Sequence, residues 1–204
     1  MFDGTFWDEL YRSRSAVWSG NPNIQLVNEV SDLTPGSALD VGCGEGADAI
    51  WLAERGWRVT AADISAVALE RARAVVVSVD VARRIDWLHT DLVAGAPPSA
   101  SYDLVSAQFM HLPRVPRELL FRRLAASVKP QGTLLIVGHH PSDLQTTVPR
   151  PPMPELFYTA ADVAALLEPN TWEIIVEVSR ARSTTDPAGR IVTIHDAVLR
   201  ARRR

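Results

Sequence analysis

The stretch LDVGCGEGADAIWLAERGWRVTAADIS, Leu39–Ser65, decides the fold of this 204-residue chain. It begins with a short apolar run and passes through glycines at three alternate positions, Gly42, Gly44 and Gly46. Apolar residues at helical spacing follow, and an alternating segment that ends at Asp63 predicts a second strand. A strand, a bare turn and a helix together bring backbone N–H groups and the positive end of the helix to a ligand.

The middle of the chain repeats the alternation of strand and helix. A helix is predicted from Pro116 to about Val128, and three further strands are predicted at 84–89, 102–107 and 132–138. Such alternation indicates parallel strands that are joined by right-handed crossovers.

The last quarter departs from that rhythm. Segments 171–178 and 190–200 flank the turn-like TDPAG, so they should pair antiparallel. We therefore predict an α/β fold: an open seven-stranded sheet, mostly parallel, with an antiparallel C-terminal hairpin and helices on both faces.

Length and composition predict one domain over 1–204, since no internal repeat is found. Residues 1–34, with a first helix at Phe2–Arg14, are interpreted as a helical lid on a core formed by 35–204. Segment 139–158 is rich in proline and has no periodicity, and long loops of this kind often cover active sites. We expect it to be a loop on the substrate side.

The net charge and the cysteine content argue against a nucleic-acid partner and against a metal site. The formal net charge of −3 does not favour nucleic acid as a partner, and the basic ending Arg200–Arg204 is interpreted as a solvated strand end. The single cysteine, Cys43, reads as a small apolar filler, and no Cys/His cluster has the spacing of a metal site. No apolar run reaches the length of a membrane span, so we expect a cytoplasmic protein with no membrane partner.

The glycine motif alone leaves two ligands open. It also satisfies the dinucleotide pattern GxGxxA, with Asp63 near the distance expected for an acid that binds a ribose. A nicotinamide-dependent oxidoreductase is therefore one alternative. Asp40 lies two residues before the first glycine, where its carboxylate would repel a pyrophosphate but suit a ligand with an ammonium and a sulfonium. Asp40 therefore favours a cationic ligand.

Four ordered segments now resemble the class I S-adenosylmethionine-dependent methyltransferases, whose fold is Rossmann-like. LDVGCGEG matches the first motif, ADIS the acid that ends the second strand, HTDL the third motif and YDLVSA the fourth strand. The resemblance implies S-adenosylmethionine as cofactor and S-adenosylhomocysteine as product. It also implies these contacts: Gly42 and Gly44 with the methionine part, Asp63 with both ribose hydroxyls, Ile64 along the adenine, Asp91 and Leu92 at the adenine amino edge, and Gln108 at the methionine end.

The N-terminal aromatic residues Trp7, Tyr11 and Trp18 resemble the lead of a small-molecule subgroup that includes the tellurite-resistance and thiopurine methyltransferases. The resemblance implies that Tyr11 and Trp18 contact the cofactor, although packing of a helix on the core is the alternative. The tellurite-type proteins carry a His-Arg pair where this chain has Ser183 and Thr184. That departure argues against tellurite as the substrate.

Histidines at the carboxyl ends of the predicted strands are the candidate catalytic bases: His111, His139 and His140. Methyl transfer needs close placement of the reactants, exclusion of water and removal of a proton from some acceptors. His89 and His195 lie inside strands and are expected to be structural.

The sequence favours a small-molecule acceptor. An RNA or protein acceptor is disfavoured because the chain shows no basic face, and Gln108, Phe109 and Met110 stand where an NPPY-type motif would follow the fourth strand. A non-catalytic module that binds S-adenosylmethionine remains an alternative. Neither the acceptor atom nor the oligomeric state follows from the sequence.

Overall fold

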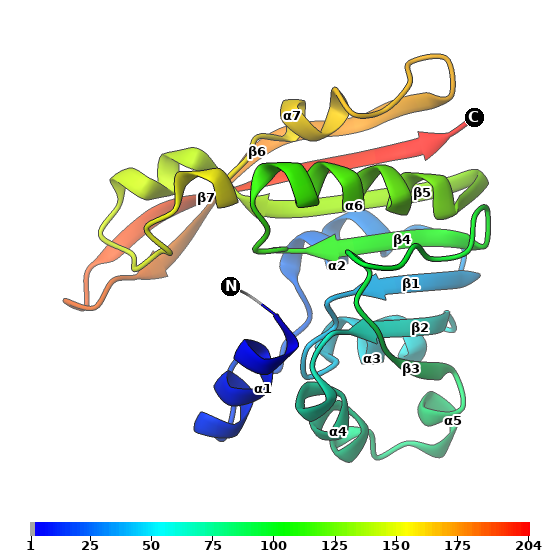
Figure 1. Cartoon of the computed structure of the whole chain (residues 1–204), viewed down its shortest axis with the longest axis horizontal. Helices are drawn as coiled ribbons and strands as arrows, with labels where there is room; N and C mark the ends of the chain where they lie inside the picture. Colours follow the sequence, from blue (N-terminus) through cyan, green and yellow to red (C-terminus); the bar gives the residue numbers. More distant parts are fainter. Residues whose placement is uncertain (1–2) are drawn as a thin grey trace.

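The computed structural model describes residues 3–204, so Phe2 of the first predicted helix lies outside the described residues. Its centre is a seven-stranded sheet with the order β3-β2-β1-β4-β5-β7-β6 (Figure 1). The strands are β1 (Ser37–Val41), β2 (Arg58–Asp63), β3 (Ile85–His89), β4 (Tyr102–Gln108), β5 (Val128–His139), β6 (Trp172–Thr185) and β7 (Ile191–Arg203). The first five pair in parallel, and β7 pairs antiparallel with both β5 and β6. The predicted fold class is confirmed.

Helices cover both faces of this sheet. One face carries α6 (Arg114–Ser127) and α7 (Ala160–Ala164), with α6 crossing in front of β4 and β5 in Figure 1. The other face carries α2 (Ile24–Val30), α3 (Ala47–Glu54), α4 (Ala66–Val75) and α5 (Val79–Ala82).

Alternation along β1 assigns its side chains to the two layers. Leu39 and Val41 belong to the hydrophobic core under α6, whereas Ala38 belongs to the core under α2 and α3. Side chains two residues apart share a face, so Asp40 points the same way as Ala38. The α3 helix therefore covers this carboxyl group.

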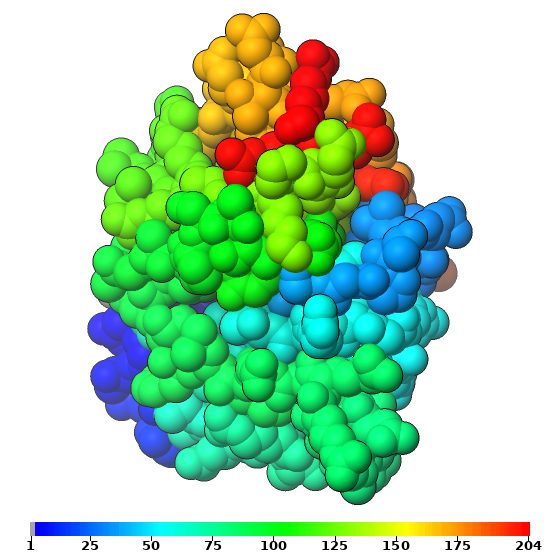
Figure 2. Space-filling view, turned by 90° about the vertical axis from the view of Figure 1, so that its right-hand side faces the viewer, coloured from blue at the N-terminus to red at the C-terminus, as the bar shows by residue number. Residues whose placement is uncertain are grey.

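The carboxyl ends of β1, β2 and β4 meet at one edge of the sheet, on the left in Figure 1. Helix α1 (Gly4–Ser13) and the far end of the β6–β7 hairpin lie at this same edge. Figure 2 looks at the opposite edge, where the early strands lie in the lower half and the C-terminal segments at the top. Open α/β sheets bind ligands at the carboxyl edge, which places the site on the left in Figure 1.

One detail differs from the sequence expectations. Segment 139–158 is not structureless, because it contains two short 3-10 helices, η1 (Pro141–Gln145) and η2 (Pro154–Leu156). The basic ending is the end of strand β7, with Arg202 and Arg204 exposed, as interpreted from the sequence. Within it Ala201 is buried and Arg203 donates to the carbonyl of Val128.

Candidate active site

The glycine turn after β1 folds back over the end of β2. Gly42 and Gly44 have φ angles of +68° and +52°, in the left-handed region that favours glycine. The N–H groups of Gly42 and Cys43 both donate to the carbonyl of Ala62, over 2.8 and 3.1 Å. A Cβ atom on Gly44 would lie 2.8 Å from the hydroxyl oxygen of Tyr11. Bare backbone is therefore needed here for the close approach of other groups.

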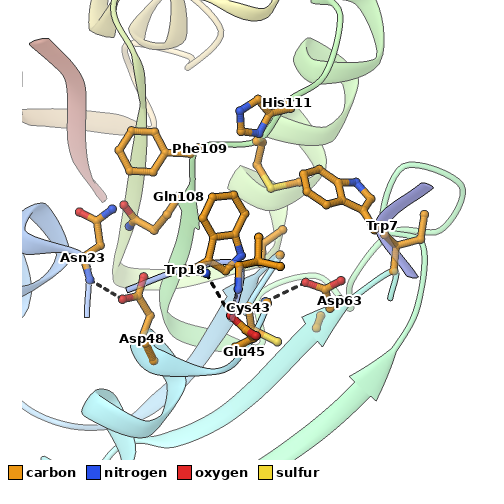
Figure 3. Close-up of a pocket in the computed structure, with 18 of the residues that line it drawn as sticks. Trp7, Trp18, Asn23, Cys43, Glu45, Asp48, Asp63, Gln108, Phe109 and His111 are labelled. Carbon is orange, nitrogen blue, oxygen red and sulfur yellow. Dashed lines mark hydrogen bonds between the residues drawn. The ribbon is translucent and has the colours of Figure 1, made fainter. Parts of the chain in front are cut away.

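A cavity of about 770 Å³ lies over this turn (Figure 3). Such a volume is within the range of small-molecule sites. Most of the residues predicted from the sequence line its wall: Tyr11, Trp18, Gly42, Gly44, Asp63, Ile64, Asp91, Leu92, Gln108, His111 and His139. Asp40 and His140 are not part of the wall.

Asp40 lies behind the turn rather than in the cavity. Its side chain is buried beneath α3, and its Oδ2 atom has no hydrogen-bond partner among residues 3–204. Burial raises the pKa of Asp40 well above its usual range, and the carboxyl groups of Asp48 and Asp63 add to the effect. Direct contact of Asp40 with a ligand, as expected from the sequence, does not fit this placement.

Asp63 joins the end of β2 to the glycine turn. Its Oδ2 accepts from the N–H of Gly44 and its Oδ1 from the N–H of Ser65, each over 2.8 Å. Burial raises the pKa of this carboxyl group, and the backbone N–H donors oppose the shift. Because a carboxylate has about four acceptor positions, it can hold the turn and still accept from a ligand in the cavity.

The predicted adenine side of the site is formed after β2 and β3. Asp91 accepts from the N–H groups of Val93 and Ala94 over 2.8 and 3.2 Å, which stabilises the turn that presents Leu92 to the cavity. His89 lies 3.0 Å from the carbonyl oxygen of Ile64 through its Nε2 atom. His89 is thus the structural residue that was expected.

Asp48 is a cavity residue that the sequence analysis missed. It lies in the first turn of α3, accepts from the N–H of Asn23 over 2.6 Å, and burial raises its pKa to about 6. Gln108 lies nearby in Figure 3; its Nε2 donates to Ser106 over 2.7 Å, and its Oε1 is buried without a partner in the described chain. Asp48 and Gln108 thus bring oxygen atoms that can accept further hydrogen bonds to one end of the cavity. Such an arrangement suits a cationic group such as an ammonium.

The aromatic wall comes from the N-terminal region. The Nε1 of Trp18 donates to the hydroxyl of Tyr11 over 2.9 Å. Glu45 of the glycine turn accepts from the N–H groups of Val17 and Trp18, each over 3.1 Å, and pairs with Arg71 over 3.0 Å. The glycine turn therefore holds the segment that closes the cavity.

Two of the three candidate histidines meet at the other end. The ring centroids of His111 and His139 are 5.7 Å apart, and Phe109 lies 4.5 Å from His139. Burial lowers the pKa of both histidines, that of His139 to about 3, so both are neutral at physiological pH. Trp7 lies beside His111, with 6.1 Å between ring centroids.

His140 has a structural role instead. Its Nδ1 accepts from the N–H of Ser142 over 3.2 Å and lies 2.9 Å from the hydroxyl of the same serine, which caps η1. Since β-strand side chains alternate, adjacent residues at the end of β5 point in opposite directions. Only His139 of the pair reaches the cavity.

Two arginines at the histidine end also had no signal in the sequence. Arg150 from segment 139–158 and Arg182 from β6 both line the cavity. Arg150 pairs with Asp143, and Arg182 pairs with Asp196. The paired residues are 7 and 14 positions apart, but only the docking of both segments at the edge of the sheet brings the two arginines to the cavity.

The cavity fits S-adenosylmethionine on its own geometry. The turn at Gly44 leaves no room for a side chain, the acceptors Asp48 and Gln108 suit an ammonium, and Asp63 is placed for ribose hydroxyls. Among residues 3–204, no group of three or more Cys, His, Asp or Glu side chains is arranged to hold a metal ion. Within the same range, no helix has both the length and the apolarity that crossing a bilayer requires.

Comparison with known proteins agrees with this geometry. Residues 38–132 match a family described as a methyltransferase domain. An uncharacterised methyltransferase of Mycobacterium tuberculosis is 37% identical over 122 residues, which cover 59% of each chain. The release factor glutamine methyltransferase of Rhodopirellula baltica is 31% identical over 122 residues, covering 55% of this chain and 41% of that protein. The present chain thus matches only about three fifths of the length of its mycobacterial relatives.

Solved structures share the fold at low sequence identity. TehB from Haemophilus influenzae superposes with a TM-score of 0.73 at 19% identity, over 97% of this chain and 66% of that one. Magnesium protoporphyrin IX methyltransferase from Synechocystis, solved with bound S-adenosylhomocysteine, gives a TM-score of 0.61 at 20% identity, over 98% and 83% of the two chains. Residues 38–132 thus match the methyltransferase domain family, and the chain shares the fold of these solved S-adenosylmethionine-dependent methyltransferases.

Proposed function

We propose that this protein transfers a methyl group from S-adenosylmethionine to a small-molecule acceptor. The observation that carries the proposal is that one cavity joins the glycine turn and Asp63 to His111 and His139. Cofactor residues and candidate acceptor residues thus face the same cavity. A non-catalytic binding module would not need neutral imidazoles at the far end of its ligand cavity.

The residues around the turn would hold the cofactor, which supplies an electrophilic methyl group on a sulfonium. Asp63 would accept from the ribose hydroxyls while it keeps its bonds to the turn. Asp48 and Gln108 would accept from the ammonium, and Leu92 would pack on the adenine. Trp18 and Tyr11 would cover the turn and exclude water from it.

The neutral histidines would handle the acceptor. His139 stays unprotonated at all physiological pH values, so its ring can accept a hydrogen bond from a thiol, hydroxyl or amine. His111 would lie on the other side of the same acceptor, next to Trp7. When the acceptor carries a proton, one of these rings would receive it as the new bond to carbon forms. His140 is left out of this proposal because it does not line the cavity.

The small-molecule class rests on the enclosure of the cavity by segments of the chain itself. Residues 7–24 form one side and Pro149–Pro151 another, which leaves room for a compact acceptor. We keep residues 1–34 as the proposed lid and 139–158 as the proposed substrate-side segment. The cytoplasmic location and the absence of a nucleic acid or membrane partner stay predictions.

Calorimetry with S-adenosylhomocysteine and a turnover screen with small thiols, phenols and amines test the proposal together. We expect binding of S-adenosylhomocysteine but not NAD, and formation of S-adenosylhomocysteine from S-adenosylmethionine with at least one acceptor. His139→Gln should reduce turnover while leaving S-adenosylhomocysteine affinity within about twofold, and His140→Gln, its neighbour outside the cavity, should keep turnover. Binding without turnover of any acceptor would favour the non-catalytic module, and preference for NAD would favour an oxidoreductase.

A further inference from the structure

The acceptor end of the cavity contains the two guanidinium groups of its wall, each paired with a carboxylate. Arg150 and Arg182 line it, while the acids at the cofactor end, such as Asp48 and Asp63, accept from backbone N–H groups. Asp196 also lines the cavity, so what this end offers a ligand is guanidinium N–H donors rather than a net positive charge.

Both arginines are held in place by buried carboxylates. The Nη2 of Arg150 lies 2.8 Å from Asp143, and the Nε of Arg182 lies 3.0 and 2.9 Å from the two oxygens of Asp196. Each carboxylate has a second donor, because Asp143 accepts from the N–H of His195 and Asp196 accepts from the side chain of Gln25. The acids are therefore fixed, and they orient the guanidinium groups.

Neither guanidinium group has all of its donors used. A guanidinium has five N–H donors, and one nitrogen of each arginine is bonded to its carboxylate. The Nε of Arg150 is buried without a partner among the described residues, and this side chain is only 14% exposed. A buried donor that is left unused costs stability and needs a physical explanation, and completion by a bound ligand is the one that we pursue.

The two arginines line the same cavity as His139. In the sheet, His139 lies opposite Asp196, the partner of Arg182, in the register of β5 with β7. Burial is the main cause that lowers the pKa of His139; the positive charge of Arg150 follows, and that of Arg182 lowers the pKa further. Both guanidinium charges thus act on the ring that is the proposed neighbour of the methyl acceptor.

We propose that the acceptor is an anion: an apolar body that carries a carboxylate or a similar oxyanion, which Arg150 and Arg182 bind beside His139. Planar guanidinium groups suit oxyanions because they donate two parallel hydrogen bonds. Trp7, Phe109 and Pro151 provide apolar walls for the body of the molecule. This inference rests on the proposed function, because it identifies the anion as the methyl acceptor.

The methionine carboxylate of the cofactor offers the same chemistry and is the competing source of the anion. The two sources are separated by testing each ligand alone. Benzoate and benzamide serve as acceptor probes, because they have the same shape and differ in charge. S-adenosylhomocysteine reports on the cofactor carboxylate.

The experiment measures benzoate and benzamide binding by tryptophan fluorescence, with and without saturating S-adenosylhomocysteine, since Trp7 and Trp18 line the cavity. The unaltered protein should bind benzoate about tenfold more tightly than benzamide. Arg150→Gln and Arg182→Gln should each remove most of that preference. Arg202→Gln is the matched control, because it removes one positive charge from an exposed pair with Glu173 on the same hairpin.

Three results would overturn the inference. One is equal affinity for benzoate and benzamide, or no binding of either; another is a preference for benzoate that survives in both cavity variants. The third is a loss of S-adenosylhomocysteine affinity in those variants with the benzoate preference unchanged, which would assign the arginines to the cofactor carboxylate. Arg150→Lys keeps the charge but not the planar group, so partial recovery there would separate recognition from a folding defect. Any of these three results would overturn only the inference about the anion. The proposed function would still hold if the unaltered protein binds S-adenosylhomocysteine normally.

Discussion

Gly44→Ala is the sharpest test of how the N-terminal segment closes on the glycine turn. The residue has a φ of +52°, and a Cβ there would lie 2.8 Å from the hydroxyl of Tyr11 and 3.2 Å from the Nε1 of Trp18. Tyr11 is 3% exposed and its hydroxyl accepts from Trp18, so relief of this contact must displace the hydrogen-bonded pair. The substitution should therefore separate the turn from both aromatic side chains.

The expected loss of folding free energy in Gly44→Ala has two parts. A left-handed alanine costs about 1–2 kcal/mol of folding free energy, and loss of the hydrogen bond between Tyr11 and Trp18 costs about 1 kcal/mol more. Gly189→Ala isolates the first part, because Gly189 has a φ of +79° and its added Cβ would meet no described atom within 4 Å. We expect roughly 2–3 kcal/mol of destabilisation for Gly44→Ala against roughly 1–2 kcal/mol for Gly189→Ala.

Denaturant unfolding measures the two stabilities, and calorimetry with S-adenosylhomocysteine measures the site. Cofactor affinity should fall about tenfold in Gly44→Ala, because the displaced aromatic wall no longer excludes water, and should not change in Gly189→Ala. If both variants lose the same stability and both keep full affinity, then Tyr11 and Trp18 do not close on the turn in solution, and the reasoning fails.

Three further predictions concern the same cavity. Asp63→Ala should weaken S-adenosylhomocysteine binding by about 1.5–3 kcal/mol in calorimetry, since it removes charge-assisted hydrogen bonds; an unchanged dissociation constant in a folded variant would limit Asp63 to holding the turn. Burial raises the pKa of Asp48 from 3.8 to about 6, so the folded state binds this proton more tightly than the unfolded chain and loses stability as pH rises between those values. Asp48→Asn should therefore raise the free energy of unfolding by roughly 1–3 kcal/mol at about pH 7.5 but not at about pH 3.5, while weakening cofactor binding; equal effects at both pH values would contradict the shift. Cofactor binding should slow hydrogen exchange in residues 3–20 far more than around Val41, and protection that is the same with and without cofactor would count against the lid.

The sequence predicted which residues surround the glycine turn because that part of the cavity is built from neighbouring segments of the chain. Gly42 and Gly44 follow directly on a strand, and Asp63 ends the next, so chain order alone brings them to one edge. The strand positions followed from apolar runs and turn residues in the same way. Asp48 could have been found, because a carboxylate in the first turn of the helix after the glycines must lie near the ligand.

The acceptor end could not be predicted because it depends on distant pairing. Arg182 enters the cavity only because β7 lies between β5 and β6, and strand order is not encoded in any short pattern. His139 and His140 were equivalent in the sequence, and only the pleat at the end of β5 distinguishes them.

The position of β7 between β5 and β6 affects how the sheet assembles and how related proteins can come to differ in substrate. Within the described sheet β6 contacts only β7, so the two strands form a hairpin that must dock on β5 as one unit. That hairpin already contains the pair of Arg182 and Asp196, whereas the cofactor end is built from β1, β2 and β4. One of the two arginines proposed to bind the acceptor, Arg182, therefore belongs with its partner carboxylate to a single hairpin with short-range contacts. Exchange of this hairpin between relatives would alter which molecules are methylated while leaving the methyl donor the same.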